Sequence, residues 1–390
     1  MREIRFHDPL IVPEDNSFYC FSTDTNINGV QISKSEDLLD WRLLKPALAY
    51  IPDYVKRHVG VEYFWAPELI KVDGIWRLYS CASRFGTTQS TIFLSTSASL
   101  EEDFEPQGEV IRTYERDDKN TPNAIDPNVV SDESGRQYLV YGSFFGGIWI
   151  KRLDANGFIY TSGYGKKIAG GLNRPIEGAY IYYNQNTNFY YLFISYGDLN
   201  NDYHIRVARS RNIEGPYIDS SGEDLNNLDP IKHPGDKLIG SYNLYKEPGE
   251  AFIAPGHNSI LEIGDEIFIV HHVRKENENK SKSYLQIRRL YFLNNGQVVA
   301  SPLTHPENKT REALDFKTNK LNLIRFTKFN NDISYPFATN IEGCKFLDNQ
   351  EIVLKISNDY YRGKTFISDK TQYVTCINTD GECIWGYYRL

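Results

Sequence analysis

Short runs in which hydrophobic and polar residues alternate recur along residues 7–300 and predict β-strands. One unit contains an acidic or small residue, an apolar strand, a polar or glycine turn and an aromatic strand. It occurs five times, and its copies begin at His7, Ala66, Asp126, Glu177 and Gly256. Each copy is followed by another alternating strand, whereas helix-period apolar stripes are almost absent. Four short strands in about 40 to 60 residues are typical of a propeller blade, so we predict an all-β fold with a five-bladed β-propeller. The alternative is a β-sandwich series whose copies share only a general strand and turn composition.

The fourth copy is longer than the others. The equivalent positions Asp8, Glu68, Asp126, Glu177 and His257 are separated by 60, 58, 51 and 80 residues. The long interval indicates an insertion, and residues 219–250 are rich in Gly, Pro, Asn and Asp. This composition predicts a surface loop over one face of the propeller, where it could block one end of a groove.

The repeat stops near Ser301. Residues 302–319 are polar, and the following stretch to Leu390 contains short β-type runs such as EIVLKIS and CIWGYYRL. These runs predict a small separate β-barrel or sandwich. We therefore expect a catalytic propeller at residues 1–305 and a small C-terminal β-domain at residues 306–390, which shows no candidate catalytic cluster.

Composition narrows the possible partners. The chain has 28 Tyr, 21 Phe and 5 Trp, and this aromatic content agrees with a strand-rich fold. Its net charge of −8 gives no basic footprint for nucleic acid or an anionic membrane, so we expect a neutral or small ligand. The cysteines are unclustered and are expected to be reduced: Cys20, Cys81, Cys344, Cys376 and Cys383.

The N-terminus bears on location. The first residues, MREIRFHDPLIVPED, lack the apolar stretch of a signal peptide, and no run approaches the length of about 18 apolar residues that a membrane helix needs. We expect a cytoplasmic protein from the sequence as it stands, or a secreted one if a leader has been removed. No organic cofactor and no membrane partner are expected, and the oligomeric state stays open.

The candidate chemistry lies at the starts of the repeats. The first strand of every propeller blade lines the central channel, so the five equivalent positions should converge there. They would form a carboxylate-rich site of the kind that cleaves glycosidic bonds with one acid and one base. A single Asp-Pro or Glu-Gly pair is more often a turn or a strand entry. Carboxylates that recur at equivalent positions are harder to explain by turn chemistry.

Over residues 5–300 the chain resembles glycoside hydrolase family 43, whose five-bladed propellers act on arabinan and xylan side chains. The motifs that carry the resemblance are HDP at 7–9, FWAPE at 64–68, NAIDPNVVSDESGRQYLVYGSFFGGI at 123–148, RPIEGAYIYY at 174–183 and GHNS at 256–259. Within the family the third motif looks most like endo-acting α-1,5-L-arabinanases, which implies arabinan or arabino-oligosaccharides as substrate. The alternatives are an exo-acting arabinofuranosidase, a β-xylosidase, or a noncatalytic sugar-binding propeller.

The resemblance implies roles for three carboxylates. Asp8 matches the general base that activates water, and Glu177 matches the general acid that protonates the departing oxygen. Asp126 matches a third carboxylate that orients the acid and keeps its pKa high, which agrees with the effect of a neighbouring negative charge. Family members invert the anomeric centre, so we predict about 6.5 to 9.5 Å between the carboxyl groups of Asp8 and Glu177. Glu68 lies in an element that is more structural than catalytic in the family.

The resemblance also implies a cation ligand and several substrate-binding residues. His257 matches a histidine that binds one cation near the channel axis, often calcium, largely through water, since calcium prefers six to eight oxygen ligands. A histidine hydrogen-bonded into the channel wall is the alternative. The adjacent His271 and His272 should face opposite sides of a strand and not chelate together. The predicted substrate-binding residues are Trp65, Phe144, Ser143, Asn123 and Arg274. Packing between blades is the alternative for the two aromatic residues.

Overall fold

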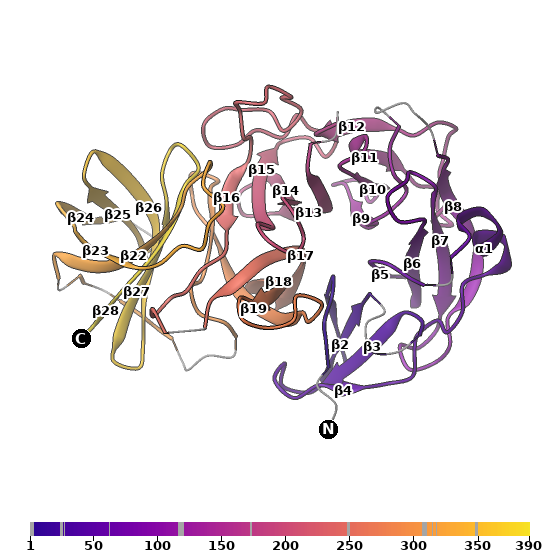
Figure 1. Cartoon of the computed structure of the whole chain (residues 1–390), viewed down its shortest axis with the longest axis horizontal. Coiled ribbons are helices and arrows are strands. Elements are labelled where there is room, and N and C mark those ends of the chain that lie inside the picture. Colours follow the sequence, from indigo (N-terminus) through magenta and orange to yellow (C-terminus); the bar gives the residue numbers. More distant parts are fainter. Residues whose placement is uncertain are drawn as a thin grey trace.

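A computed structural model describes residues 4–23, 26, 28–61, 63–115, 121–171, 174–247, 250–305, 310–313, 315–316, 318–347 and 350–390. Five sheets, each of four sequence-consecutive antiparallel strands, make the first part of the chain. They are arranged around a ring (Figure 1). The predicted five-bladed β-propeller is confirmed.

The blades follow the order of the chain. Blade 1 contains β1 (Leu10–Glu14), β2 (Ser17–Ser22), β3 (Gln31–Ser35) and β4 (Arg42–Leu43). Blade 2 contains β5 (Glu68–Val72), β6 (Ile75–Ser83), β7 (Ser90–Ser97) and β8 (Glu105–Thr113). Blade 3 contains β9 (Asn128–Ser131), β10 (Gln137–Ser143), β11 (Gly147–Arg152) and β12 (Lys166–Ala169). Blade 4 contains β13 (Ile176–Asn184), β14 (Phe189–Tyr196), β15 (His204–Ser210) and β16 (Asp236–Ile239). Blade 5 contains β17 (Phe252–Ile263), β18 (Glu266–Lys275), β19 (Tyr284–Phe292) and β20 (Val298–Ala300).

Antiparallel pairing decides which loops share a face. The second strand of a blade returns toward the start of the first, so the loop between the second and third strands lies at the end where the first strand begins. The segments that enter each first strand lie at that end as well. We call this end the entry face of the propeller, and the repeated motifs lie on it.

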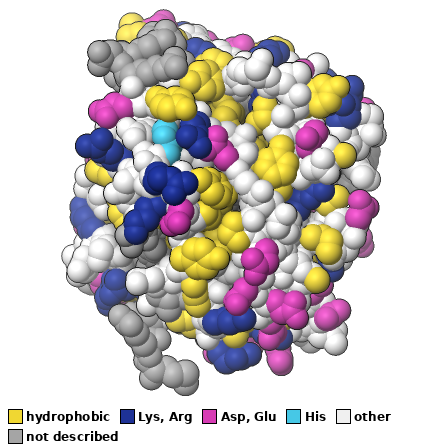
Figure 2. Space-filling model, turned by 90° about the vertical axis from the view of Figure 1, so that its right-hand side faces the viewer, with side chains coloured by type: hydrophobic (Ala, Val, Ile, Leu, Met, Phe, Trp, Pro, Cys, Tyr) yellow, Lys and Arg dark blue, Asp and Glu magenta, His cyan; other side chains and the backbone are white. Residues whose placement is uncertain are grey.

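One helix, α1 (Asp53–Val59), lies between blades 1 and 2 and buries Val55 and Val59. These two side chains join a cluster with Phe64 and Phe93 from the neighbouring blade. Figure 2 shows the side of the molecule near this helix, where hydrophobic, acidic and basic side chains are interspersed. None of the described helices has the length and hydrophobicity to cross a bilayer.

Among the described residues, no strand is shared between the first and last blades where the ring closes. Blade 1 meets blade 5 through a cluster that includes Ile11, Cys20, Leu261 and Val270. The hydroxyl of Ser259 also donates to the carbonyl of Pro9 across 2.8 Å. Side-chain packing and single hydrogen bonds therefore hold this seam, and Asp8 lies beside it.

The C-terminal sheet follows the propeller. Its strands pair in the order β23-β22-β28-β27-β26-β25-β24, and β21 pairs with β26. The bounds are β21 (Arg311–Glu312), β22 (Lys320–Phe326), β23 (Phe337–Asn340), β24 (Gly343–Phe346), β25 (Glu351–Ile356), β26 (Asp359–Ser368), β27 (Thr371–Ile377) and β28 (Cys383–Arg389). The sheet curls into a half-barrel beside blades 4 and 5 (Figure 1). The predicted small C-terminal β-domain is confirmed. The predicted boundary after residue 305 adjoins positions 306–309, which are outside the described residues.

The prediction of a surface loop over residues 219–250 was wrong for Asp236–Ile239, which form a buried strand, whereas most of the other described residues of the segment lie in turns and loops. The segment supplies β16, the outer strand of blade 4, and it packs against the C-terminal sheet. Leu238 and Tyr242 share one hydrophobic cluster with Phe326 and Trp385. The polar composition did not reveal this packing, because buried polar groups of the segment are paired across the interface with the C-terminal sheet. One such pair is the 2.8 Å ion pair between Lys328 and Asp219.

Candidate active site

Four positions in or just before the first strands of blades 1, 3, 4 and 5 share a left-handed backbone conformation. Asp8, Asp126 and His257 have φ values of 52°, 54° and 24°, and Gly178 of blade 4 has 61°. Each lies at the entry face. Asp and His adopt this left-handed region more readily than most residues with a side chain. The repeat recognised in the sequence is therefore a repeat of backbone geometry.

Glu177 lies one residue before the left-handed position of blade 4. The pairing of β13 with β14 shifts register between Glu177 and Tyr180. Such a bulge re-aims the side chains around it. The extra residue brings the Glu177 carboxyl into the group formed by Asp126, Asp8 and His257, all of which act on its pKa.

Glu68 is not part of this group. It is the first residue of β5 and is buried, and its Oε1 accepts hydrogen bonds of 3.2 Å from the Asn128 side chain and from the Val129 N–H. Burial raises its pKa to about 8. The predicted equivalence of Glu68 with the other carboxylates was wrong, because the corresponding position of blade 2 is Ala66, two residues before the strand. Glu68 joins blade 2 to blade 3.

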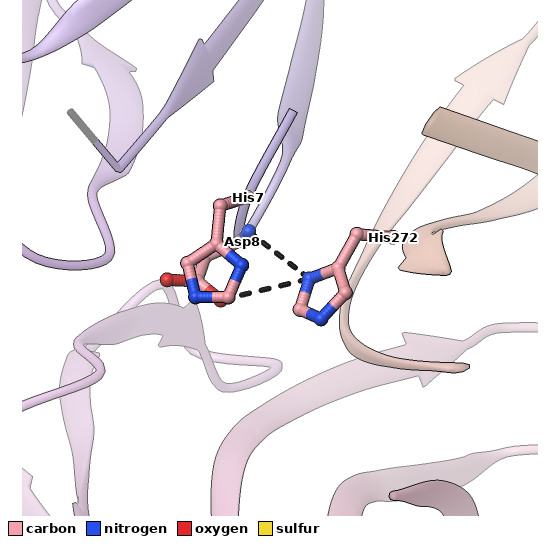
Figure 3. Close-up of side chains that lie close together, drawn as sticks. All are labelled: His7, Asp8 and His272. Atoms are coloured by element: carbon pink, nitrogen blue, oxygen red, sulfur yellow. Dashed lines mark hydrogen bonds and ion pairs between the residues drawn. The ribbon is translucent and has the colours of Figure 1, made fainter. Parts of the chain in front are cut away.

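Three imidazoles surround one oxygen of Asp8. Oδ1 lies 3.4 Å from His257 Nδ1, 3.6 Å from His7 Nε2 and 3.7 Å from His272 Nδ1. The other oxygen accepts a 2.5 Å hydrogen bond from the Thr23 hydroxyl. The Asp8 N–H donates to His272 Nδ1 across 3.2 Å (Figure 3). Burial alone would raise the Asp8 pKa, but His7, His257, the Thr23 hydroxyl and Arg274 outweigh it and hold that pKa below its ordinary value.

Asp126 and Glu177 are shifted in the opposite direction. Burial and the nearby Asp8 raise the pKa of Asp126 to about 8. Burial and the nearby Asp126 raise the pKa of Glu177 to about 7. The Gly178 N–H donates to Asp126 Oδ2 across 2.9 Å, and the Tyr203 hydroxyl donates to Glu177 Oε1 across 2.9 Å. The site therefore holds an ionised Asp8 beside a pair of carboxyls that retains protons near neutral pH.

Gly178 is required where it lies. A Cβ at this residue would approach the His257 ring and the Ser195 hydroxyl to 3.2 Å, and the backbone is left-handed. A side chain would press on the histidine next to Asp8. The glycine after Glu177 thus lets blades 4 and 5 approach each other at the site.

The predicted aromatic contacts lie at the entry face. Phe144 belongs to the loop between β10 and β11, is 39% exposed and stacks on Phe145 with ring centroids 4.3 Å apart. Trp65 is partly buried and lies 6.3 Å from the ring of Phe85, which is 82% exposed. Both positions leave aromatic surface at this face. Their contact with a sugar stays a prediction.

The other predicted substrate contacts are buried. Asn123 and Ser143 have exposures of 2% and 0%, and Asn123 Nδ2 donates to Ser143 Oγ across 3.2 Å. Asn123 Oδ1 accepts a hydrogen bond from the Ser90 hydroxyl of blade 2. Their hydrogen bonds join blades 2 and 3. Arg274 lies closer to the carboxylates, with Nη1 3.3 Å from His272 Nε2, and its charge lowers the Asp8 pKa.

His257 borders the carboxylates, with Nδ1 3.4 Å from Asp8 Oδ1, and its role as a cation ligand stays a prediction. Among the described residues, one cluster has ligand atoms within 4.8 Å of one another, namely His7, Asp8 and His272. Two imidazoles and one carboxylate are a poor donor set for calcium, and His272 Nδ1 already accepts the Asp8 N–H. These side chains do not form a calcium cage by themselves. The neighbouring His271 is not part of this cluster; burial and the charge of Arg288 lower its pKa to about 3.

Sequence reasoning missed Tyr203. It directly precedes β15, the third strand of blade 4, and its hydroxyl donates to Glu177 Oε1. A Cβ on Gly256 would lie 2.1 Å from its ring, so the glycine of the GHNS motif makes room for this tyrosine. The sequence offered one signal, the glycine that precedes His257. A glycine does not identify the aromatic residue that packs on it, and that residue lies 53 positions away. His7 and Thr23 were missed as Asp8 contacts for the same reason.

Comparisons with known proteins agree with this geometry. A family model described as glycosyl hydrolases family 43 matches residues 2–298. An extracellular endo-α-(1→5)-L-arabinanase of Thermotoga petrophila is 32% identical over 340 residues, covering 77% of this chain and 71% of the relative. The extracellular endo-α-(1→5)-L-arabinanase 2 of Bacillus subtilis is 29% identical and covers 99% of this chain and 93% of its own length. The crystal structure of endo-1,5-α-L-arabinanase from Thermotoga petrophila RKU-1 superposes with a TM-score of 0.87 at 27% identity, covering 99% of this chain and 98% of that one.

Proposed function

The chain belongs to glycosyl hydrolase family 43, and from this premise we propose that it is an endo-acting α-1,5-L-arabinanase. The relatives named endo-arabinanases support this choice, since one of them aligns with nearly the whole chain, including the C-terminal region. The substrate is linear arabinan or an arabino-oligosaccharide. The bond cleaved is the α-1,5-L-arabinofuranosidic bond.

One observation carries the proposal: two carboxyl groups of one site have pKa values shifted in opposite directions. Asp8 is ionised, because its pKa lies below its ordinary value. Glu177 has a pKa of about 7 and keeps its proton in slightly acidic to neutral solution. An inverting glycosidase needs this combination of a base and an acid.

Each group has a defined task. Asp8 accepts a proton from water as the water oxygen attacks the anomeric carbon. The glycosidic C–O bond breaks, and Glu177 gives its proton to the departing oxygen. The product has inverted configuration, which requires space for water between the two carboxyl groups. The predicted separation of about 6.5 to 9.5 Å follows from that requirement and stays a prediction.

Asp126 sets the acid strength of Glu177. Two buried carboxyls that share a site titrate as a pair, so loss of the first proton raises the pKa of the second. The Gly178 N–H can only donate and therefore favours the Asp126 anion. The Tyr203 hydroxyl can donate or accept, and so it tolerates a protonated Glu177. Although the Asp126 pKa of about 8 lies above the Glu177 pKa of about 7, the donor geometry leads us to assign the first negative charge of the coupled pair to Asp126 and the remaining proton to Glu177.

A cation near His257 remains part of the proposal. Calcium would need water for most of its ligands here, since the described side chains offer few oxygen atoms. His257 would contribute one nitrogen, and a bound cation would add positive charge beside Asp8. Treatment with a chelator should lower activity and calcium should restore it. Unchanged activity would favour the alternative of a histidine held in the channel wall.

The names of the relatives bear on location. Both curated arabinanases above are called extracellular, which supports the secreted alternative for this chain over the cytoplasmic one. The C-terminal region accompanies the propeller in the Bacillus subtilis relative, which covers nearly the same length.

The test is the early product profile on linear α-1,5-arabinan. A spread of oligosaccharide lengths is expected for endo cleavage. Release of arabinose or one short product from the start would indicate an exo enzyme. No cleavage of arabinan, with turnover of xylosides, would overturn the substrate assignment. Proton NMR of the first product reports the anomeric configuration and tests inversion.

A further inference from the structure

A pocket of about 590 Å³ lies where blades 4 and 5 meet the C-terminal sheet. Its volume falls in the range of about 300 to 1,000 Å³ that is usual for small-molecule sites. We propose that this pocket is a sugar subsite that holds part of the arabinan chain away from the cleaved bond. The proposal rests on the arabinanase function stated above.

The propeller part of the pocket belongs to the entry face. Asn201 and Asp202 come from the loop between β14 and β15, and Glu276 and Lys280 come from the loop between β18 and β19. Both loops join second to third strands, so they lie at the end where Glu177 and Asp8 lie. Ser241 comes from the segment that enters blade 5. A sugar chain bound at the carboxylates can therefore extend over these loops.

Two lining residues of the pocket are linked through the chain or a hydrogen bond to residues beside the proposed catalytic carboxylates. Asp202 precedes Tyr203, whose hydroxyl donates to Glu177. On the other side, the Lys280 carbonyl accepts a 2.6 Å hydrogen bond from Nε of Arg274. Each wall of the pocket thus continues into a residue that contacts or neighbours the acid or the base.

The C-terminal sheet supplies the remaining wall through the loop between β22 and β23. Asn331, Asp332, Ile333 and Tyr335 line the pocket. Ile333 packs with Tyr203 in one apolar cluster. This contact places the loop close to the residue that holds Glu177.

Backbone and side-chain bonds hold the loop in place. The Ser334 N–H donates to the Ser241 carbonyl across 2.9 Å. Lys237 Nζ donates to the Asn330 carbonyl across 2.6 Å. Asn331 Nδ2 donates to Asp202 Oδ2 across 3.0 Å. The pocket wall is therefore preorganised, which lowers the cost of binding a ligand.

The lining favours a neutral polyhydroxylated ligand. Glu276 and Asp332 offer acceptors for hydroxyl groups and disfavour an anion. Asp202 is a poor cation ligand, because Asn331 and the Asp198 N–H already occupy its oxygens and Lys280 adds a positive charge nearby. Tyr335 is 48% exposed and gives an aromatic face on which a sugar ring can stack. Polar groups beside one aromatic ring are the chemistry that recognises a furanose unit.

The experiment compares chain-length dependence in the full-length enzyme. Linear α-1,5-arabino-oligosaccharides of increasing length are digested by wild type, Tyr335→Ala and Asp332→Ala. Tyr360→Ala is the matched control, because Tyr360 is 61% exposed on β26 of the C-terminal sheet and does not line the pocket. Tyr335→Ala should lower kcat/KM for the longest oligosaccharides about tenfold, the scale of one well-packed binding contact, and leave the shortest cleaved oligosaccharide unchanged. Asp332→Ala should do the same to a smaller extent, and the control should match wild type.

The outcomes separate the subsite from the proposed function. If wild type cleaves no arabinan or arabino-oligosaccharide, the function fails and the subsite falls with it. If wild type is active and the Tyr335→Ala and Asp332→Ala variants keep its chain-length dependence, only the subsite is overturned. An equal loss at every length would show that Tyr335 supports the fold and would also overturn it.

Discussion

The hydroxyl of Tyr203 donates a 2.9 Å hydrogen bond to Oε1 of Glu177, although Glu177 lies on β13 and Tyr203 lies in the loop that enters β15. The ring of Tyr203 fills the space beside Gly256, where a Cβ would lie 2.1 Å away. On its other side it packs against Ile333 of the C-terminal sheet. The proposed acid is therefore held by a tyrosine whose own position depends on blade 5 and on the second domain.

This hydrogen bond predicts a pH effect. The bond lowers the pKa of Glu177, which is about 7 in the intact site. A general acid works only while protonated, so activity should fall as the pH rises through about 7. Tyr203→Phe removes the donor and should move the alkaline limb of the kcat/KM profile to higher pH. Tyr217→Phe is the control, since its hydroxyl bonds to the Ile213 carbonyl. An alkaline limb that stays at the wild-type pH or moves to lower pH would contradict the assignment of Glu177 as the general acid.

Loss of the proposed acid should depend on the leaving group. Glu177→Gln should lower turnover of arabinan by about 10²- to 10⁴-fold, the range attributed to general acid catalysis. Aryl arabinosides with good leaving groups need less protonation and should be spared. Initial rates on both substrates check this. An equal loss on both would argue against the acid role.

Loss of the proposed base should not depend on the leaving group. Asp8→Asn should inactivate the enzyme on natural and aryl substrates alike, because water is no longer deprotonated. Added azide can attack without a base, so it should restore turnover from the water side. Product analysis by NMR would show the inverted glycosyl azide. A product of retained configuration would contradict the role of Asp8.

Gly178 offers a test of the site's packing. Gly178→Ala adds a Cβ within 3.2 Å of the His257 ring on a left-handed backbone and should destabilise the fold by about 1 to 3 kcal/mol. It should also lower kcat, because His257 borders Asp8. Gly222→Ala is the matched control: the backbone is also left-handed, at φ 88°, but a Cβ there meets nothing within 4 Å. Thermal unfolding and kcat should separate the two variants. Equal kcat values would show that His257 adjusts freely.

The interface between the domains depends on a buried ion pair. Lys328 Nζ lies 2.8 Å from Asp219 Oδ2, with side-chain exposures of 8% and 0%. Lys328→Met leaves Asp219 buried and unpaired, which should cost about 3 to 5 kcal/mol of stability. The double variant with Asp219→Asn should recover only part of that loss, because one amide oxygen cannot accept from the Ser221, Glu223 and Gly235 N–H groups as both carboxylate oxygens do. Denaturant unfolding measures both. A single variant as stable as wild type would show that water reaches the aspartate.

The sequence by itself determined the propeller and much of the candidate site. Strand periodicity and turn residues act over a few positions, so five similar units were readable. Because each unit begins a channel-lining strand, Asp8, Asp126 and Glu177 could be expected to meet. Counting residues between motifs grouped Glu68 with the other carboxylates. Equivalence between blades depends instead on where the paired strand begins. The pairing of β5 begins at Glu68, so Ala66, two residues earlier, occupies the entry position of blade 2.

Only the tertiary structure decided the contacts between distant segments. The hydrogen bond from Tyr203 to Glu177 depends on the distance between β13 and β15, which are separated by β14 in the sheet of blade 4. The docking of residues 219–250 depends on complementary groups such as Lys328, more than a hundred positions away along the chain. Polar composition indicated a surface loop there, because it cannot distinguish polar groups facing water from those paired across an interface. Local pattern predicts elements, whereas burial and pairing arise from the packing of the whole chain.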